Sequence, residues 1–450
     1  MQLFVVGAGH VGLVTAVGLA NLGHQVTVSD IDARRIERLK AGVPPIYEPG
    51  IGEAVRVHLA TGRLAFQLGN VPPRAVTTSI VAVSTPEGPD GPLSMVHVLA
   101  ATRDLLAAVG PDHAIVVRST LPLDGPDRLV ALRGSGGPAI ATNPEFMREG
   151  SAIADFMAPD RIVAGWLEPR DQAAAETVVG LYQGIAAPRL VVDARSATLI
   201  KLASNVFLAT KIAFANELAR ICEAYGGDVR LVADGIGMDD RIRRGALNAG
   251  PGFGGSCLPE QAVALSELAA ARRVATPLID AVTRSNLTHQ DEIVTRVASL
   301  LRAPADGSLG DGLRPDRRLA GRRIALLGLA FKARTDDVRA SPAIALGKRL
   351  RAAGATVAAT DPHAGPRALA ADPELTVVES VGAAVDGADA VLVATEWPEY
   401  GSIDWASVAR RMAGDLVYDT RAIVDRDAVV AAGLRLVSLG GREERVPAPT

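Results

Sequence analysis

Cysteine is nearly absent from this chain of 450 residues, which contains only Cys222 and Cys257. Two cysteines cannot build the disulfide framework of a small secreted protein, so we expect a reducing, cytoplasmic compartment. No stretch reaches the ~18 consecutive apolar residues of a membrane helix. The N-terminus also lacks the basic region and cleavage signal of a secretory peptide. The sequence therefore predicts a protein that does not span a membrane.

Strong charge of either sign is also lacking. The net charge is −3 and no long basic run occurs, which argues against nucleic acid or an anionic membrane surface as a partner. The seven histidines are scattered, and no His, Cys or Asp spacing is typical of a metal site. We therefore predict no nucleic-acid partner, no membrane partner and no metal.

Length and composition instead indicate a large globular protein. A chain of 450 residues exceeds one ordinary hydrophobic core, so two or three domains are expected. Hydrophobic residues make up 48% and charged residues 22% of the chain, which is normal usage for such a protein.

The N-terminus carries a dinucleotide-binding pattern. Residues 3–6 predict a short buried strand, and Gly7-Ala8-Gly9-His10-Val11-Gly12 follows it directly. A helix is expected at 13–22 and a second strand at 25–29, which ends at Asp30. In this order the first glycine makes the tight turn, the second admits a pyrophosphate and the third lets helix and strand pack. Asp30 would accept the ribose hydroxyls, which favours NAD over NADP.

Polar residues follow three further predicted strands of the first half. Ser84-Thr85-Pro86 ends a strand expected at 79–83, and Arg118-Ser119-Thr120 ends one expected at 114–117. The segment 143–150 follows a strand expected at 139–142. Ligands bind at such carboxyl ends in open α/β sheets, although Ser and Thr are more often helix caps. Glu145 and Glu149 in the third loop are acid/base candidates. A solvated turn with a salt bridge is an equal alternative for these two carboxylates.

The longest helical pattern covers Ser196 to Tyr225. Apolar residues recur in it at helical spacing, and Lys201 and Asn205 lie one turn apart. A helix of this length and apolarity between two α/β blocks suits a domain connector and a subunit interface. The alternative for Lys201 is an ordinary surface lysine.

The segment Pro251-Gly252-Phe253-Gly254-Gly255-Ser256-Cys257-Leu258-Pro259 is a poor helix or strand. Its glycines permit positive φ and a close approach of the backbone to a ligand, and its prolines fix the two ends. Because cysteine is so rare here, Cys257 is a candidate nucleophile. The alternative is a plain connection with an incidental cysteine.

The last third of the chain restarts the strand pattern. Residues 303–320 have the composition of a mobile linker, and strands are expected at 323–328, 355–360, 388–394 and 415–418. This second α/β unit has no GxGxxG, so it should bind a nucleotide differently or only pack. The tail from Gly441 is expected to be disordered.

Taken in order, these motifs resemble the UDP-glucose/GDP-mannose dehydrogenase family. The resemblance covers nearly the whole chain and rests on residues 7–12, 45–50, 119–120, 143–150, 201–205, 251–259 and 328–342. The form PGFGGSC is more similar to the UDP-glucose branch. The family implies an α/β fold of two Rossmann-like domains joined by a long dimerising helix, with NAD on the first domain and the nucleotide sugar bridging to the second. The implied ranges are 1–195 for the NAD domain, 196–302 for a central helical region, 303–320 for a linker and 321–450 for the UDP-sugar domain.

The resemblance also implies a four-electron oxidation of a sugar C6 alcohol by NAD, through a thiohemiacetal and thioester on Cys257. A thiolate is a strong nucleophile and an acceptable leaving group. Lys201 would stabilise an oxyanion, Asn205 would orient the intermediate, and Thr120 and Glu145 would handle water and protons. Cys222 would be a core residue.

The residues that the resemblance implies fall into three groups. The catalytic group is Cys257, Lys201, Asn205, Glu145, Thr120 and Gln261. The cofactor group is Gly7, Gly9, Val11, Gly12, Asp30, Arg35, Thr85, Thr120, Glu149 and Arg339. The substrate group is Glu145, Phe146, Met147, Glu149, Lys201, Asn205, Asn248, Gly252, Phe253, Gly254, Phe331, Lys332 and Arg421, with Arg241 reaching over from a neighbouring subunit of a homodimer or larger homo-oligomer.

One departure from the family falls beside the cysteine. Glu260-Gln261 stands where the family normally has Lys-Asp, and His10 replaces an aromatic residue in the glycine loop. Gln261 cannot accept a proton as Asp does. Three alternatives therefore stay open: full oxidation of UDP-glucose or a related nucleotide sugar, an enzyme with an impaired second half-reaction, and a non-catalytic NAD- and nucleotide-binding homologue.

Overall fold

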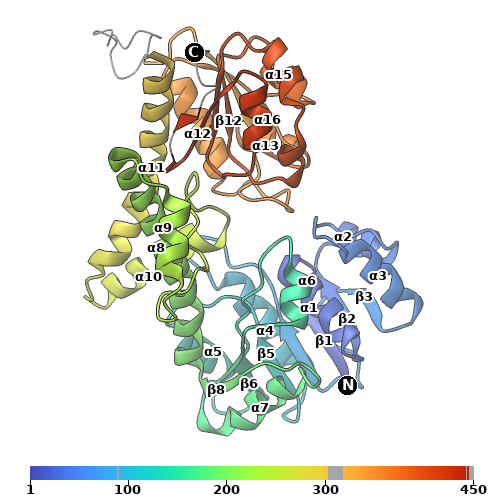
Figure 1. Ribbon diagram of the computed structural model, residues 1–450. Coiled ribbons are helices and arrows are strands. Elements are labelled where there is room, and N and C mark those ends of the chain that lie inside the picture. The colour runs from blue at the N-terminus through green and yellow to red at the C-terminus, as the bar shows by residue number, and fades with distance from the viewer. Residues whose placement is uncertain (89–90, 303–317, 442, 445–450) are drawn as a thin grey trace. The chain divides into compact units, whose positions relative to one another are not determined.

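The computed structural model describes residues 1–88, 91–302, 318–441 and 443–444 (Figure 1). The chain forms two compact units, one of Met1–Ser204 with Val263–Ala275 and one of Asn205–Ala262 with Thr276–Thr450. Most of the predicted linker, 303–317, and most of the predicted tail lie outside the described residues. The domain limits expected from the resemblance remain predictions.

The first unit is built on an eight-stranded sheet of order β3-β2-β1-β4-β5-β6-β7-β8. Its strands are β1 (Gln2–Val6), β2 (Gln25–Asp30), β3 (Leu64–Leu68), β4 (Thr78–Val81), β5 (Ala114–Val117), β6 (Ala139–Thr142), β7 (Ile162–Trp166) and β8 (Arg189–Asp193). All neighbours are parallel except β6 and β7. The strand order reverses at β1, which pairs with β2 on one side and β4 on the other. Ligands bind at such a switch point in doubly wound folds.

Helices cover this sheet because its strands are apolar on both faces. Leu3 to Val6 of β1 are at most 1% exposed, as expected of a parallel strand that is buried on both sides. The covering helices are α1 (His10–Asn21), α2 (Ala33–Lys40), α3 (Ile51–Ala60), α4 (Val96–Ala108), α5 (Gly125–Arg133), α6 (Ala152–Met157) and α7 (Gln172–Gly180), with a short 3₁₀ turn at Pro169–Asp171.

Two helices belong to both units. α8 (Ala194–Tyr225) runs for 32 residues, and α10 (Cys257–Ala271) begins at the candidate nucleophile. By length and composition alone α8 could cross a membrane, but 44% of its most apolar window is buried within the protein, and a buried core helix passes the same test. The second unit adds α9 (Val229–Gly237) and α11 (Pro277–Arg302).

The second sheet repeats the topology of the first, in the order β11-β10-β9-β12-β13-β14-β15. Its strands are β9 (Arg323–Leu327), β10 (Thr356–Thr360), β11 (Thr376–Val377), β12 (Ala390–Val393), β13 (Leu416–Asp419), β14 (Arg435–Ser438) and β15 (Glu443–Glu444). Only β14 and β15 pair antiparallel. The helices around it are α12 (Pro342–Ala352), α13 (Gly365–Ala371), α14 (Val381–Val385), α15 (Trp405–Arg411) and α16 (Arg426–Ala431), with a 3₁₀ turn at Pro398–Ser402 (Figure 1).

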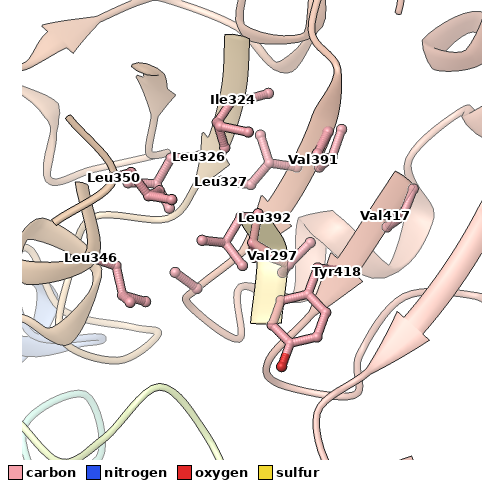
Figure 2. Packing of buried hydrophobic residues seen from close by; sticks show 14 of the residues in the cluster. Val297, Ile324, Leu326, Leu327, Leu346, Leu350, Val391, Leu392, Val417 and Tyr418 are labelled. Carbon is pink, nitrogen blue, oxygen red and sulfur yellow. The ribbon is translucent and has the colours of Figure 1, made fainter. Parts of the chain in front are cut away.

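The core of the second unit lies between this sheet and its helices. Figure 2 shows Ile324 and Leu326 of β9 with Leu392 of β12 and Tyr418 of β13, and Val297 of α11 lies among them. α11 therefore packs on the second sheet and is part of that core. Cys222 of α8 is buried in the same cluster, and burial raises the pKa of its thiol, helped by the charges of Asp228 and Glu223. The prediction that Cys222 is a core residue is confirmed.

The fold class predicted from the sequence is confirmed. The helix expected at 196–225 is α8, and the strands expected at 114–117 and 139–142 have those limits in the structure. The strands expected in the last third also form, and their ends differ from the predicted ones by at most two residues.

Candidate active site

The glycine loop between β1 and α1 is shaped by close contacts. Gly7 has φ +102°, and a Cβ there would lie 2.6 Å from the carbonyl oxygen of Ala82. A Cβ on Gly12 would lie 1.8 Å from the carbonyl oxygen of Gly7. Gly9 caps α1 without a side-chain hydrogen bond and faces open space. No side chain caps the start of α1, so this end of the helix suits a phosphate.

Asp30 lies at the end of β2 beside this loop. Its carboxylate accepts hydrogen bonds from the backbone N–H groups of Ala8 and Asp32, each at 2.9 Å, and from Arg35 at 2.8 Å. Burial raises the pKa of Asp30, but these bonds outweigh burial and hold the pKa below its usual value. The carboxylate is therefore charged at neutral pH, and the partly exposed Arg35 is its ion-pair partner.

Residues 45–50, on which part of the resemblance rests, have a structural role that the sequence did not reveal. Glu48 is buried, and its two oxygens accept the backbone N–H groups of Gly150 at 2.7 Å and Ala152 at 2.8 Å. His10 Nε2 lies 3.4 Å from the same carboxylate. Glu48 therefore ties the loop that carries Glu145 and Glu149 to the start of α1.

Glu145 and Lys201 form a buried ion pair in the first unit. Lys201 Nζ lies 2.9 Å from Glu145 Oε1, and the side chains are 4% and 8% exposed. Burial raises the pKa of Glu145, but the charge and hydrogen bond of Lys201, the charge of Arg118 and the N–H of Met147 outweigh it, so the pKa is lowered. The surface-lysine and solvated-turn alternatives are wrong for these two residues. Phe146 lies beside them, 5.5 Å from Lys201 Nζ and 3.8 Å from the guanidinium of Arg161.

A small cavity opens beside this ion pair. Its volume is about 10 Å³, close to the space of one water molecule. The polar groups that line it include Ser119, Thr120, Thr142 and Lys201. Thr120 therefore lies with Lys201 at one site, as the resemblance implies, and the cavity has the size and polarity to hold a water.

Arg118 is a buried residue whose role the sequence analysis missed. Its guanidinium donates to Thr15 Oγ1 at 2.8 Å, to Asn143 Oδ1 at 2.5 Å and to the Tyr182 hydroxyl at 2.7 Å. It therefore links α1, β6 and the segment after α7. Because these acceptors are neutral, its positive charge acts on Glu145 and helps to keep that carboxyl ionised. The only signal in the sequence was its place before Ser119-Thr120.

In the second unit, α10 begins with Cys257. The thiol is exposed, and its sulfur lies 3.7 Å from Ser256 Oγ. One turn later Gln261 is buried, and its Oε1 accepts a hydrogen bond from Asn205 Nδ2 at 2.9 Å. The structure thus brings together two of the predicted catalytic positions, Asn205 and Gln261, one turn of α10 from the cysteine.

The glycines before Cys257 allow a close approach to the protein itself. Gly252 has φ +116°, and a Cβ there would lie 2.7 Å from Asn286 Oδ1. Gly255 has φ +79°, and a Cβ there would lie 2.8 Å from the ring of Phe331. The N–H of Gly255 donates to the carbonyl oxygen of Arg339 at 3.0 Å. The predicted substrate residue Phe331 therefore borders the cysteine loop.

Arg421 lies near the same loop. Its guanidinium donates to the carbonyl oxygens of Ala394 at 3.0 Å and Phe331 at 3.3 Å and pairs with Glu396 at 3.1 Å. A Cβ on Gly250 would lie 3.2 Å from it. Lys332 Nζ lies 5.4 Å above the ring of Phe331. These residues gather at the carboxyl ends of β9, β12 and β13, where a nucleotide would bind.

The other predicted site residues differ in their exposure and in their own contacts. Arg241 is exposed and forms an ion pair with Asp239 at 2.6 Å, which leaves it accessible to another subunit. Arg339 pairs with Asp337 at 2.5 Å. Asn248 is exposed, and three further predicted residues are half-buried, namely Val11, Thr85 and Glu149. In the described parts of the chain, no group of three or more His, Cys, Asp or Glu residues is arranged to hold a metal ion.

The chain is similar to known proteins over nearly its whole length. Three models of the UDP-glucose/GDP-mannose dehydrogenase family match it: the NAD binding domain at residues 1–186, the central domain at 195–288 and the UDP binding domain at 325–426. A UDP-glucose 6-dehydrogenase of Bacillus subtilis is 37% identical over 454 residues, which cover 99% of each chain. One of Rickettsia felis is 36% identical over 453 residues, which cover 100% of this chain and 98% of the relative. The solved UDP-glucose dehydrogenase of Pyrobaculum islandicum is 38% identical, with a TM-score of 0.79 over 95% of each chain.

Proposed function

Because this chain belongs to the UDP-glucose/GDP-mannose dehydrogenase family, we propose that it is an NAD-dependent enzyme that oxidises UDP-glucose to UDP-glucuronate. The observation that carries the proposal is the full-length similarity to UDP-glucose 6-dehydrogenases. The C6 alcohol loses four electrons on the way to a carboxylate, so the reaction consumes two equivalents of NAD. Of the three alternatives left open by the sequence, the comparisons favour the first.

The first unit supplies the groups that would hold NAD. The uncapped first turn of α1 and the open space at Gly9 suit its pyrophosphate, and the charged carboxylate of Asp30 suits its ribose hydroxyls. When bound, NAD accepts a hydride in each oxidation step.

The residues of the chain itself carry the remaining chemistry. The thiol of Cys257 adds to the C6 aldehyde, forming a C–S bond while its proton passes to a base. The buried ammonium of Lys201 offsets the negative charge that develops on the C6 oxygen. Once the adduct is a thioester, water breaks the C–S bond, releases the carboxylate and restores the thiol. Glu145, held ionised by Lys201 and Arg118, accepts a proton from that water.

The decisive experiment counts NADH per molecule of sugar. We expect two NADH for each UDP-glucose and UDP-glucuronate as the product in the mass spectrum. One NADH per sugar would mean that the enzyme stops at the aldehyde, and none would mean that the chain only binds nucleotides. A panel of other nucleotide sugars under the same conditions tests the substrate, because faster turnover of another sugar would overturn UDP-glucose.

We propose that the protein acts as a homodimer in the cytoplasm. Phe207, Phe214 and Ile221 of α8 are seven residues apart and are 64%, 49% and 54% exposed. Residues seven apart lie on one face of a helix, so α8 presents an apolar stripe to solvent. A second copy of the chain would cover that stripe and bring Arg241 toward the partner's substrate.

Complementation tests the dimer. Arg241→Ala and Cys257→Ala proteins should each be inactive, and mixing them should restore part of the activity through hybrid sites. Phe214→Glu should yield a monomer by light scattering, whereas Leu369→Glu, at an exposed residue of α13, should not. A monomeric wild-type protein at working concentration would refute the proposal.

A further inference from the structure

Four hydrogen bonds from buried side chains hold the backbone just before Cys257. The N–H of Gly250 donates to Asn216 Oδ1 at 2.8 Å, and the carbonyl oxygen of Gly250 accepts from His289 at 2.8 Å. The N–H of Phe253 donates to Asn286 Oδ1 at 2.8 Å, and its carbonyl oxygen accepts from Asn286 Nδ2 at 3.1 Å. Both polar backbone groups of each residue are therefore bonded to side chains of α8 or α11.

The burial of the three side chains makes these bonds selective for one loop geometry. Asn216 and His289 are 1% exposed and Asn286 is 7% exposed. If a backbone group moved away from its side-chain partner, water could not replace the lost hydrogen bond at this buried place. The ring of Phe253 is also buried, against Ala209 and Val282. Gly252 has φ +116°, and a Cβ there would lie 2.7 Å from Asn286 Oδ1, so this loop geometry requires glycine at that position.

The protonation state of His289 follows from its two partners. A carbonyl oxygen only accepts, so Nε2 carries the hydrogen that is donated to Gly250. Nδ1 lies 3.1 Å from Arg220 Nη1, which only donates, so Nδ1 carries none. Burial lowers the pKa of His289 to about 4, although the bond to Gly250 opposes that shift. At neutral pH the imidazole is therefore uncharged and fixed in one tautomer.

We propose that Asn216, Asn286 and His289 are positioning residues that hold the 250–253 backbone so that the thiol of Cys257 meets the C6 aldehyde. Cys257, which begins α10, lies only four positions after Phe253. A rigid anchor at Phe253 therefore fixes where the sulfur can lie. A displacement of about 1 Å at a reacting atom can lower a rate ~10²-fold. This inference rests on the proposed function for its chemistry, but the anchor itself can be tested without substrate.

Hydrogen exchange of the protein without ligand tests the anchor. In Asn286→Ala, peptides that cover 250–257 should exchange at least ~10-fold faster than in the wild type. Asn286→Asp keeps an acceptor for the N–H of Phe253 and loses the donor, so its exchange should fall between the two. The matched control is Ser285→Ala, which removes a hydrogen bond between α11 and Glu217 of α8 without touching the loop. Unchanged exchange in Asn286→Ala would overturn the proposal.

Kinetic measurements test whether the anchored backbone positions the thiol of Cys257. Asn286→Ala should lower acid formation by ~10²-fold, and NADH per sugar should fall from two toward one as the aldehyde escapes. The affinity for NAD should not change. Faster exchange with an unchanged yield of acid would show that the anchor does not position Cys257 and would overturn the proposal. If the wild-type protein makes no acid, the proposed function fails, whereas the exchange experiment still decides whether these side chains hold the loop.

Rescue by a similar side chain separates positioning from simple packing. His289→Gln can still donate to Gly250 and accept from Arg220, so it should retain most of the acid formation. His289→Ala, which can do neither, should resemble Asn286→Ala. Melting curves of both variants show whether the fold is intact. If His289→Gln and His289→Ala lose acid formation equally while both stay folded, hydrogen bonding by His289 is not what holds the loop.

Discussion

Replacing Lys201 with Met tests the buried ion pair with Glu145. Methionine keeps much of the length of the lysine stem but carries no charge, so Glu145 would lose the cation that lies 2.9 Å away. The N–H of Met147, which donates to Glu145 Oε2 at 2.7 Å, and the charge of Arg118 would remain. The variant therefore leaves a buried carboxylate with only part of its support.

The structure sets the expected size of the effect. Removing one partner of a buried ion pair costs about 3–5 kcal/mol of stability, and the remaining amide and guanidinium favour the lower end. For a domain of about 150–250 residues each kcal/mol lowers Tm by about 2–4 °C. Lys201→Met should therefore lower the Tm of the first unit by about 6–12 °C. The double variant with Glu145→Gln should recover most of that loss, because neither charge is then left alone.

The pH dependence gives a second test with a definite sign. The pKa of Glu145 is lowered from its usual 4.5 in the folded protein. The contribution of Glu145 to stability is therefore complete above pH about 4.5, and it is lost as the pH falls through the pKa that Glu145 has in the folded protein. Without Lys201 the burial of the carboxyl is less opposed, so its pKa rises and it takes up a proton at higher pH. The stability deficit of Lys201→Met should shrink as the pH falls below about 4.5.

Scanning calorimetry of the two single variants and the double variant, at pH 7 and at pH 4, measures both effects. A Tm for Lys201→Met within about 2 °C of the wild type would refute the ion pair as a source of stability. A deficit that is the same at both pH values would refute the assignment of the charge to Glu145. Failure of Glu145→Gln to restore Lys201→Met would mean that Lys201 stabilises another group.

Three further changes test other parts of the site. Asp30→Ala removes the carboxylate that should repel a 2′-phosphate and leaves Arg35, so the preference for NAD over NADP in kcat/KM should fall roughly 10–100-fold; an unchanged ratio would contradict the role of Asp30. Cys257→Ala should abolish acid formation and leave NAD binding by calorimetry intact, and undiminished acid would remove the thiol from the mechanism. Gln261→Glu keeps an acceptor for Asn205 and adds a base one turn from the cysteine, so release of the acid should speed up, at most ~10²–10⁴-fold. Mass spectrometry of quenched samples measures how much of the protein carries an acyl group on Cys257, and this amount should be lower in Gln261→Glu than in the wild type. Equal amounts in the two proteins would mean that a residue at position 261 does not activate the water.

Local patterns in the sequence were enough for the framework of the fold. The strand at 114–117 is a run of buried apolar residues, and α8 repeats apolar residues at helical spacing, so neighbouring residues alone identify both elements. The glycine loop was equally clear, because its three glycines stand at fixed spacing between one strand and one helix. Cys257 stood out by its rarity and its glycine-rich surroundings.

Contacts between distant parts of the chain could not be predicted in this way. The bond from Arg118 to Thr15 spans 103 residues, and the bond from Ala152 to Glu48 spans 104. Nothing near Glu48 in the sequence shows that its oxygens meet the loop after β6. Asn286 and His289 lie in an ordinary amphipathic helix, and nothing near them in the sequence shows that they bond to the backbone of Phe253 and Gly250. Such buried polar pairs depend on tertiary structure, which periodicity does not encode.

The two sheets show how one topology is put to two uses. In each, a glycine with positive φ ends the first strand, Gly7 at +102° and Gly328 at +96°. Each glycine donates its N–H to the end of the second strand at 2.8 Å, to Ser29 in one unit and Thr360 in the other. An acidic residue stands directly after Ser29 and Thr360 in the two units, namely Asp30 and Asp361. The start of the turn is therefore alike in the two units, although α1 begins at His10 soon after Gly7 and α12 begins only at Pro342.

The surroundings of the second acid decide what it can bind. Asp361 accepts the backbone N–H groups of Leu329, Ala330, His363 and Ala364 and the indole N–H of Trp397. A carboxylate offers about four acceptor positions, so these donors leave none for a ribose. Asp30 accepts hydrogen bonds from only two backbone N–H groups and from the partly exposed guanidinium of Arg35. In the second unit all acceptor positions of Asp361 are therefore taken by bonds within the protein. A nucleotide bound there must be recognised by other groups, such as Phe331, Lys332 and Arg421.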